Sequence, residues 1–384
     1  MMHTIRSFSL RLLIACLAGG FFLPCLLPAQ DHPPQPKTLA IGAQAPDFHL
    51  KGVDDRFYSL QDFADKPVLV VIFSCNHCPT AQAYEDRMIQ LVKDYADKGV
   101  GFVVISPNDP DAVSLNELGY TDLNDSFEEM KIRARDKGYN FPYLYDGDTQ
   151  QTSLAYGPVA TPHVFVFDQQ RKLRYTGRLD ASENPGTAHA EDARNAIEAV
   201  LKGEAVSLAQ TKTFGCSIKW AWKNEWKQKL LEQWAQEPVT LEEIDLQGLK
   251  QLMKNENSGK LRLINVWATW CGPCIVEFPE FITIDRMYRH RNFEFVSISA
   301  DQLKAKAQAL KLLTKWEASN PNYIINFEDK YALIEAIDPE WNGALPYTAL
   351  IAPGGEIVWR QEGIIDPLAL KRAIVDHPLM GRVY

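Results

Sequence analysis

The chain has 384 residues, of which 46% are hydrophobic, and this length favours two domains over one. Its formal net charge is −9 and it has no long basic run, so charge argues against nucleic acid as the main partner. The hydrophobic content supports packed cores and argues against a disordered chain.

The N-terminus has the pattern of a secretory signal peptide over 1–29. Arg6 and Arg11 precede an apolar run over 12–27, and a small residue stands at the expected cleavage point. We therefore expect export, to a periplasm or elsewhere in a cell envelope, with no stable membrane span after the signal is removed. A retained signal would instead tether the chain to a membrane. Residues 30–38 are rich in proline and polar residues and are interpreted as a tether.

Residues 39–222 are predicted to form the first folded domain. The continuous apolar run over 68–73 is typical of a central strand that is buried on both faces. It leads into Ser74-Cys75-Asn76-His77-Cys78-Pro79-Thr80, after which apolar residues recur at helical spacing. The sequence therefore predicts a strand, a turn with two cysteines and a helix.

Further elements complete this domain. The pattern predicts strands over 102–106, 143–145, 163–167 and 172–175, a polar and mostly helical crossover over 109–139, and a helix over 192–201. Thr161-Pro162 stands immediately before one of these strands. A proline at the head of a strand cannot donate a ladder hydrogen bond, and it often marks a special, sometimes cis, turn.

Cys216 lies far along the chain from the other cysteines. Two of the seven cysteines lie in the predicted signal, so five remain after its removal, and an odd number leaves one thiol unpartnered. Two interpretations stay open: a third thiol that resolves or shuttles a disulfide, or a buried small hydrophobic residue.

Residues 223–238 are predicted to form a helical linker. Their apolar residues have the spacing of an amphipathic helix, whose apolar face is expected to pack on a domain rather than on a membrane. The second domain is assigned to 239–384, with a helix over 245–253 before its central strand.

The second domain repeats the local pattern of the first. An alternating run over 261–266 precedes Trp267-Ala268-Thr269-Trp270-Cys271-Gly272-Pro273-Cys274, and helical spacing follows. A cysteine at a helix N-terminus faces unpaired N–H groups and the positive end of the helix dipole, so its thiol pKa falls. Cys274 is close enough to Cys271 for a disulfide. Zinc would need a second ligand pair, and none follows Cys274 in this half of the chain, so a redox couple is favoured.

At Trp-Cys-Gly-Pro-Cys the sequence resembles the thioredoxin superfamily, most closely its exported TlpA/ResA-like branch. This resemblance covers about 239 to the C-terminus. Residues 42–48 and 57–60 resemble the start of redoxin domains, the AhpC/TSA-type relatives of peroxiredoxins, and the tail around Cys216 resembles the end of such a domain. The resemblance implies an α/β fold with two tandem thioredoxin-like folds, each a central mixed sheet flanked by helices.

In each site we expect the first cysteine, Cys75 or Cys271, to be an exposed nucleophile. The second, Cys78 or Cys274, would resolve the mixed disulfide, which gives the disulfides Cys75–Cys78 and Cys271–Cys274. This chemistry needs no metal and no organic cofactor.

The resemblance also implies residues that bind substrate. In the thioredoxin fold a cis-proline beside the cysteine pair helps to bind an extended polypeptide, and Pro162 and Pro346 match that place. The residues expected to contact substrate are Pro162, Pro346, Thr161, Leu345 and Trp270.

Two further side chains are expected to tune the thiols. Glu277 stands where TlpA/ResA-like proteins carry a carboxylate near the pair, so it is expected to act as acid, base or pKa tuner; the alternative is a solvated glutamate in a first helical turn. Thioredoxin has a buried aspartate six residues before its first cysteine, but here that position is Asn265, and Leu69 in the first domain. His77 resembles the histidine between the cysteines of oxidising relatives.

These features predict an exported thiol-disulfide oxidoreductase with two Cys-x-x-Cys sites and an electron relay from the second site to a more oxidising first site. The expected partners are disulfide-containing or dithiol proteins of the cell envelope and a membrane or periplasmic thiol electron donor. One alternative is a thiol-dependent peroxidase, because Cys78-Pro79-Thr80 resembles a peroxidatic motif, although Cys75 replaces the hydroxyl residue expected before it. The other is a metal-binding module at Cys75, His77 and Cys78.

Overall fold

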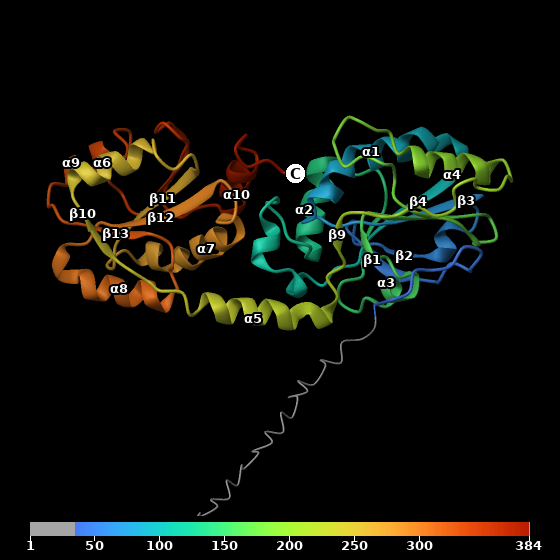
Figure 1. Cartoon of the computed structure of the whole chain (residues 1–384), viewed down its shortest axis with the longest axis horizontal. Coiled ribbons are helices and arrows are strands. Elements are labelled where there is room, and N and C mark those ends of the chain that lie inside the picture. Colours follow the sequence, from blue (N-terminus) through green and yellow to red (C-terminus); the bar gives the residue numbers. More distant parts are fainter. Residues whose placement is uncertain (1–34, 384) are drawn as a thin grey trace, which may run out of the picture. The chain divides into compact units, whose positions relative to one another are not determined.

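The computed structural model describes residues 35–383, so the predicted signal peptide and the start of the tether lie outside the described residues. Two large sheets with helices on both faces, and one two-stranded sheet, make up this part of the chain (Figure 1). Among residues 35–383, no helix combines the length and the apolar content that a bilayer crossing requires.

The first sheet has seven strands in the order β2-β1-β5-β4-β3-β7-β8. Their bounds are β1 His49–Gly52, β2 Phe57–Ser59, β3 Val68–Phe73, β4 Val100–Ser106, β5 Tyr143–Tyr145, β7 His163–Phe167 and β8 Leu173–Gly177. β3 is parallel to β4 and antiparallel to β7. All six residues of β3 are buried, as its continuous apolar run predicts.

Successive side chains of β3 point to opposite faces of the sheet and enter two separate apolar clusters. The helices that cover these faces are α1 Pro79–Tyr95, α2 Phe127–Lys137, α3 Gln151–Tyr156 and α4 Glu191–Leu201. The crossover over 109–139 holds two short 3-10 turns, Pro110–Ala112 and Leu115–Leu118, before α2. Beside the main sheet, β6 (Ala160–Thr161) pairs with β9 (Cys216–Ser217).

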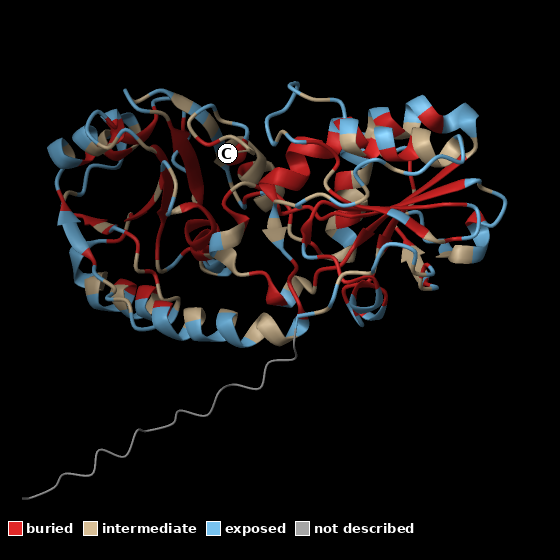
Figure 2. Cartoon of the chain, turned by 45° about the vertical axis from the view of Figure 1, so that its right-hand side comes forward, coloured by how far each residue is buried: buried red, intermediate tan, exposed pale blue. Residues whose placement is uncertain are grey.

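The second sheet has six strands in the order β10-β13-β12-β11-β14-β15. Their bounds are β10 Glu242–Ile244, β11 Leu261–Trp267, β12 Phe293–Ser299, β13 Asn322–Ile325, β14 Tyr347–Ile351 and β15 Ile357–Glu362. The helices are α6 Leu246–Lys254, α7 Gly272–Tyr288, α8 Lys306–Lys315, α9 Lys330–Ile337 and α10 Pro367–Val375. Figure 2 shows the central strands buried and the outer helix faces exposed.

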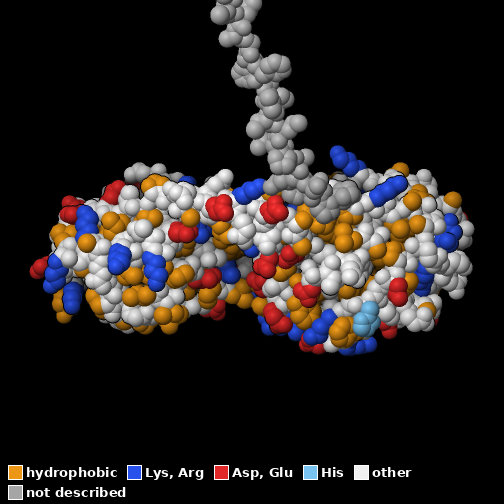
Figure 3. All heavy atoms as spheres, turned by 90° about the horizontal axis from the view of Figure 1, so that it is seen from below, with side chains coloured by type: hydrophobic (Ala, Val, Ile, Leu, Met, Phe, Trp, Pro, Cys, Tyr) orange, Lys and Arg blue, Asp and Glu red, His pale blue; other side chains and the backbone are white. Residues whose placement is uncertain are grey.

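Helix α5 (Asn224–Trp234) forms within the predicted linker. Its last residue, Trp234, is buried, and the guanidinium groups of Arg286 and Arg289 lie 5.2 and 5.3 Å from its ring centroid. Trp234 therefore packs on protein, as expected for the apolar face of this helix, whereas Trp226 nearer its start is 52% exposed. On the face that Figure 3 presents, basic side chains are scattered among acidic and apolar ones.

Candidate functional site

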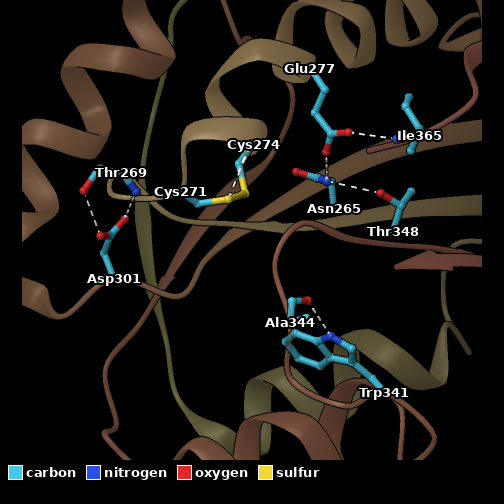
Figure 4. The surroundings of a disulfide bond; sticks show 10 residues. All are labelled: Asn265, Thr269, Cys271, Cys274, Glu277, Asp301, Trp341, Ala344, Thr348 and Ile365. Carbon is cyan, nitrogen blue, oxygen red and sulfur yellow. Dashed lines mark hydrogen bonds between the residues drawn. A yellow bond between two sulfur atoms is a disulfide. The ribbon is translucent and has the colours of Figure 1, made fainter. Parts of the chain in front are cut away.

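Cys271 and Cys274 form a disulfide at the start of α7, with their Cα atoms 5.3 Å apart (Figure 4). Cys271 is the N-cap residue of this helix, and its Sγ accepts a hydrogen bond from the backbone N–H of Cys274 at 3.3 Å. The N-terminal N–H groups and the helix dipole favour a thiolate here when the disulfide is open. Cys271 is only 6% exposed, so the expectation of an exposed nucleophile is wrong for the oxidised state.

Glu277 is buried on the same helix, not solvated. One carboxylate oxygen accepts from the Ile365 N–H at 3.0 Å and the other from Asn265 Nδ2 at 3.4 Å (Figure 4). Burial raises the pKa of Glu277 to about 7, against these two hydrogen bonds, which lower it. Glu277 can therefore hold or release a proton near neutral pH, on the helix that carries both cysteines.

Asp301 fixes the turn before Cys271. Its carboxylate accepts from the Thr269 N–H and the Thr269 hydroxyl, both at 2.8 Å, and from the Ser299 hydroxyl at 2.8 Å. Sequence reasoning missed Asp301, because no strand was predicted before it. It lies just after β12, where parallel strands of an α/β sheet often place site residues.

A cavity of about 390 Å³ adjoins the disulfide turn and is lined by the expected substrate residues Trp270 and Leu345. Tyr331 and Trp341 also line it, and the Trp341 ring N–H donates to the Ala344 carbonyl at 2.8 Å. Trp270 is 70% exposed and Tyr331 is 85% exposed. Leu345 directly precedes Pro346, so the cavity lies next to the predicted substrate-binding proline. The Leu345–Pro346 bond is cis, as expected.

The first domain holds its cysteines in a different register. Phe73 of β3 pairs with His163 after cis-Pro162, just as Val266 of β11 pairs with Tyr347 after cis-Pro346. Cys78 follows Phe73 at the same separation at which Cys271 follows Val266. By this pairing Cys78 occupies the place of Cys271.

Counting from the same paired strand residues, the other two cysteine positions do not match between the domains. Cys75 takes the place of Ala268, and Ala81 takes the place of Cys274. The first domain therefore has no thiol on the helical turn where the second domain keeps its second cysteine.

The predicted Cys75–Cys78 disulfide is absent, and both residues are free thiols. Helix α1 begins at Pro79 with Cys78 as its N-cap, so Cys75 lies outside the helix. The Cys75 thiol instead lies 3.1 Å from the Thr161 hydroxyl. Cys75 therefore lacks the helix N-terminus that was expected to activate it.

The environment favours Cys78 over Cys75 as the reactive thiol. Burial raises the pKa of Cys75 well above its usual value. Burial acts the same way on Cys78, but hydrogen bonds from the Cys216 and Cys75 side chains and the charge of His77 lower the pKa of Cys78 well below its usual value. The expectation that Cys75 is the nucleophile is therefore contradicted by its position and its surroundings.

His77 is buried and paired with Asp125, with 2.6 Å between Nδ1 and a carboxylate oxygen. Burial disfavours the charged imidazole, but the Asp125 carboxylate raises the pKa of His77. Asp125 also accepts from the backbone N–H groups of Asn76 and His77 and from Asn108 Nδ2. Nε2 of His77 has no hydrogen-bond partner among the described residues.

Ligand atoms of Cys75, His77 and Asp125 lie within 4.8 Å of one another, so their donor types and spacing could suit a metal ion. Asp125 would have to give up hydrogen bonds to act as a ligand, however. These three residues therefore fit a metal ion poorly as a set. The one nitrogen that could bind an ion without losing a hydrogen bond is Nε2 of His77.

Cys216 is brought to this site by strand pairing. Cys216 pairs with Thr161 in the register of β9 and β6, and its N–H donates to Cys78 Sγ at 3.2 Å. The Cys78 thiol in turn lies 3.3 Å from the Thr161 carbonyl oxygen. Thr161, predicted as a substrate contact, therefore holds the three cysteines together.

Gly215→Ala should weaken the pairing of β9 with β6. Gly215 has φ +125, and an added Cβ would lie 2.0 Å from the Thr161 carbonyl oxygen, so β9 would have to move. We expect a loss of about 1 to 3 kcal/mol in the free energy of unfolding, measured by urea denaturation. Gly203→Ala is the control, because Gly203 also has positive φ but open space around it. Equal losses in the two variants would contradict this account.

Two family models match the chain in tandem. The AhpC/TSA family model matches residues 41–176 and the Redoxin model matches residues 237–373. Thioredoxin of Coprinus comatus is 34% identical over 17% of this chain and 63% of its own length. Thiol-disulfide oxidoreductase ResA of Oceanobacillus iheyensis is 29% identical over 30% of this chain and 55% of its own length. The chain thus spans less than two thirds of either curated relative.

Among solved structures, a hypothetical protein of Sinorhizobium meliloti is 34% identical over 49% of this chain and 98% of that chain, with a TM-score of 0.43. The two family models cover the two sheets separately, and the ResA relative carries the name of a thiol-disulfide oxidoreductase. The chain therefore belongs to the thioredoxin superfamily, as an AhpC/TSA-type domain followed by a TlpA/ResA-like redoxin domain.

Proposed function

We propose that the protein is a thiol-disulfide oxidoreductase whose exchange site is Cys271 and Cys274. The observation that carries this proposal is a disulfide at the first turn of α7, with the buried carboxyl of Glu277 on the same helix. In the reduced form, the Cys271 thiolate attacks a substrate disulfide and releases one substrate thiolate. Cys274 then attacks the Cys271 sulfur, which re-forms the protein disulfide and releases the second substrate thiolate.

The proposed proton acceptor for Cys274 is Glu277. Because its pKa is about 7, a fraction of Glu277 is deprotonated at neutral pH and can take the thiol proton before the resolving attack. Asn265, which occupies the place of the aspartate in thioredoxin, has no acidic proton and serves to hold Glu277.

The proposed substrates are unfolded polypeptides that carry disulfides. The exposed rings of Trp270 and Tyr331, which line the cavity beside the disulfide turn, offer apolar contact to such chains. We propose that this takes place after export, because the pattern over 1–29 is that of a signal peptide and disulfide substrates persist in oxidising compartments.

Reduction of insulin by the full chain tests the proposal. With a dithiol regenerating system, we expect catalytic precipitation of the insulin B chain and loss of this activity in Cys271→Ser. Activity that survives in Cys271→Ser but is lost in Cys78→Ser would place the exchange site in the first domain and overturn the assignment.

Tyr331→Ser should raise KM for a denatured disulfide protein about threefold to tenfold, while reduction of the Cys271–Cys274 disulfide by dithiothreitol stays unchanged. The ring is 85% exposed at the cavity, so its loss removes substrate contact but no buried packing. Leu208→Ser, at a side chain that is 54% exposed in the first domain, is the control. A rise in KM of the same size in both variants would contradict a role for the cavity.

We also propose that electrons pass from the second site to the first. The stabilised thiolate of Cys78 supports this direction, because a stabilised reduced form makes its disulfide more oxidising. Equilibration of each site with glutathione buffers, read by mass spectrometry, measures both potentials. A first site as reducing as the second would remove the gradient.

A peroxidase is the second candidate, favoured by the position of Cys78 at the N-cap of α1 directly before Pro79. Two observations count against it. Cys78 has no exposed surface, and Cys75 stands three residues before it, where a peroxidase would have a serine or threonine. Consumption of hydrogen peroxide in a coupled dithiol assay, lost in Cys78→Ser, would support this function.

A further inference from the structure

We propose that the working redox couple of the first domain is Cys78 with Cys216, and that a reducing dithiol protein enters this couple at the sulfur of Cys216. This inference goes beyond the proposed exchange at Cys271 and Cys274 and beyond the proposed relay, neither of which assigns the redox couple of the first domain. It assigns the distant Cys216, rather than the nearby Cys75, as the partner of the thiol at the helix N-terminus.

The strand register places Cys216 against Cys78. The pairing of Thr161 with Cys216 brings the Cys216 N–H within 3.2 Å of Cys78 Sγ, and the Cys216 side chain packs against the cluster of Cys75, Cys78 and Ala81. This approach depends on Gly215, since any side chain there would meet the Thr161 carbonyl oxygen. The close approach of β9 to Cys78 is therefore specified by residues on both sides.

In the first domain, the residue three positions after the N-cap cysteine is not a cysteine. In the second domain, Cys274 follows the N-cap by three residues and closes the disulfide. In the first domain that position is Ala81, so the thiol that pairs with Cys78 cannot come from the first turn of α1. The two thiols beside Cys78 are Cys75, in the same buried cluster, and Cys216, which packs against that cluster.

Access separates these two thiols. Cys75 is 3% exposed and Cys78 has no exposed surface, whereas Cys216 is partly exposed. A thiolate must approach a disulfide sulfur directly to attack it, so an incoming protein can reach the couple only from the side of Cys216. A Cys75–Cys78 disulfide would be closed to such a partner unless the site opened.

The exchange balances with a dithiol protein as reductant. Its thiolate attacks the Cys216 sulfur, the bond between Cys78 and Cys216 breaks, and the electron pair leaves on Cys78 as a thiolate. The second thiol of the partner protein then attacks the partner's first cysteine sulfur in the mixed disulfide. This releases the Cys216 thiolate and leaves the partner with a disulfide. The Cys216 backbone N–H donates to the Cys78 sulfur and the charge of His77 lowers the pKa of Cys78, so the Cys78 thiolate is a good leaving group.

Disulfide mapping of the full chain tests the pairing. Trypsin separates Cys216, in the peptide 213–219, from Cys75 and Cys78, which share a longer peptide. After oxidation with oxidised glutathione, we expect 213–219 linked to Cys78, both in the natural sequence and in Cys75→Ser. A Cys75–Cys78 or Cys75–Cys216 link with no Cys78–Cys216 link would overturn the pairing, and this result needs no variant that could misfold.

Trapping tests the point of entry. The probe is thioredoxin whose second active-site cysteine is replaced by serine, added to the oxidised full chain. We expect its mixed disulfide on the peptide 213–219, at least tenfold more often than on the peptide of Cys75 and Cys78, and unchanged in the neighbouring control Ser217→Ala. Adducts chiefly on Cys75 or Cys78 would overturn entry at Cys216. Cys271 and Cys274 lie together on a different tryptic peptide, 263–286, so failure here is distinguishable from failure of the proposed function.

Discussion

Replacing Cys274 with serine should turn the second site into a trap for its substrates. Cys271 would still attack a substrate disulfide from the N-cap of α7, but no second thiol would remain on the first turn to release the mixed disulfide. We expect a covalent adduct that is visible on non-reducing gels and disappears with reducing agents. Insulin turnover should fall by roughly 10³-fold or more, the scale seen when one member of a covalent catalytic unit is removed.

Cys271→Ser supplies the contrast for this experiment. It removes the attacking thiol, so turnover should fall as far as in Cys274→Ser, but no adduct should form. Adducts of equal yield in the two variants would mean that Cys274 attacks substrate directly. That result would reverse the order of the two thiols while leaving the site itself in place.

The segments beside each cysteine pair could be predicted because their signals are local. The apolar run over 68–73 and the proline at each strand head are written in adjacent residues, and the structure has β3 at these bounds and both Pro162 and Pro346 in cis form. The same holds for the turn with Cys271, where the helix starts as expected.

The register of the first cysteine motif differs from the expected one, although the sequence carries a signal for it. Proline suits the first turn of a helix, where its missing N–H costs little. In the second motif the proline, Pro273, lies between the cysteines, so α7 starts before the second cysteine. In the first motif Pro79 follows both cysteines, so α1 starts after them and Cys78 becomes the cap. The Cys-x-x-Cys spacing is the same in both motifs, so it does not show where the helix begins relative to the cysteines.

Partners from distant segments could not be found in the sequence. Asp125 reaches His77 from 48 residues away, and the Ile365 N–H reaches Glu277 from 88 residues away. The contact of Cys216 with Cys78 depends on β6 and β9, which are two residues each. A strand of that length leaves no periodicity to read.

Glu277→Gln should remove the pH dependence that this carboxyl gives to turnover and to stability. In the natural protein we expect turnover to rise with pH through about 7, as Glu277 loses the proton that blocks it as a base for Cys274. In the variant we expect turnover at neutral pH to fall by about 10²-fold, with no inflection near pH 7.

The expected sign of the stability change follows from the raised pKa. Between the usual glutamate pKa of 4.5 and about 7, the folded state keeps a proton that the unfolded state has lost, so the free energy of unfolding falls as pH rises through this window. Above pH 7 Glu277→Gln should therefore be the more stable protein, by up to about 3 kcal/mol. The new amide nitrogen can donate to Asn265 Oδ1, which has no partner among the described residues.

Glu280→Gln is the matched control, because Glu280 lies on the same helix and burial also raises its pKa, but it faces Lys371 instead of Asn265. Asp285, whose pKa burial raises to about 6, adds a slope of the same sign in every variant, so the measured quantity is the difference between urea denaturation curves at pH 5 and pH 8. An inflection near pH 7 that survives in Glu277→Gln would assign the proton transfer to another group. A second outcome is that Glu277→Gln removes the pH dependence of turnover, but the change in free energy of unfolding between pH 5 and pH 8 is the same in the variant and the natural protein. Glu277 would then titrate at the same pH in the folded and unfolded chains, and burial could not be what sets its pKa.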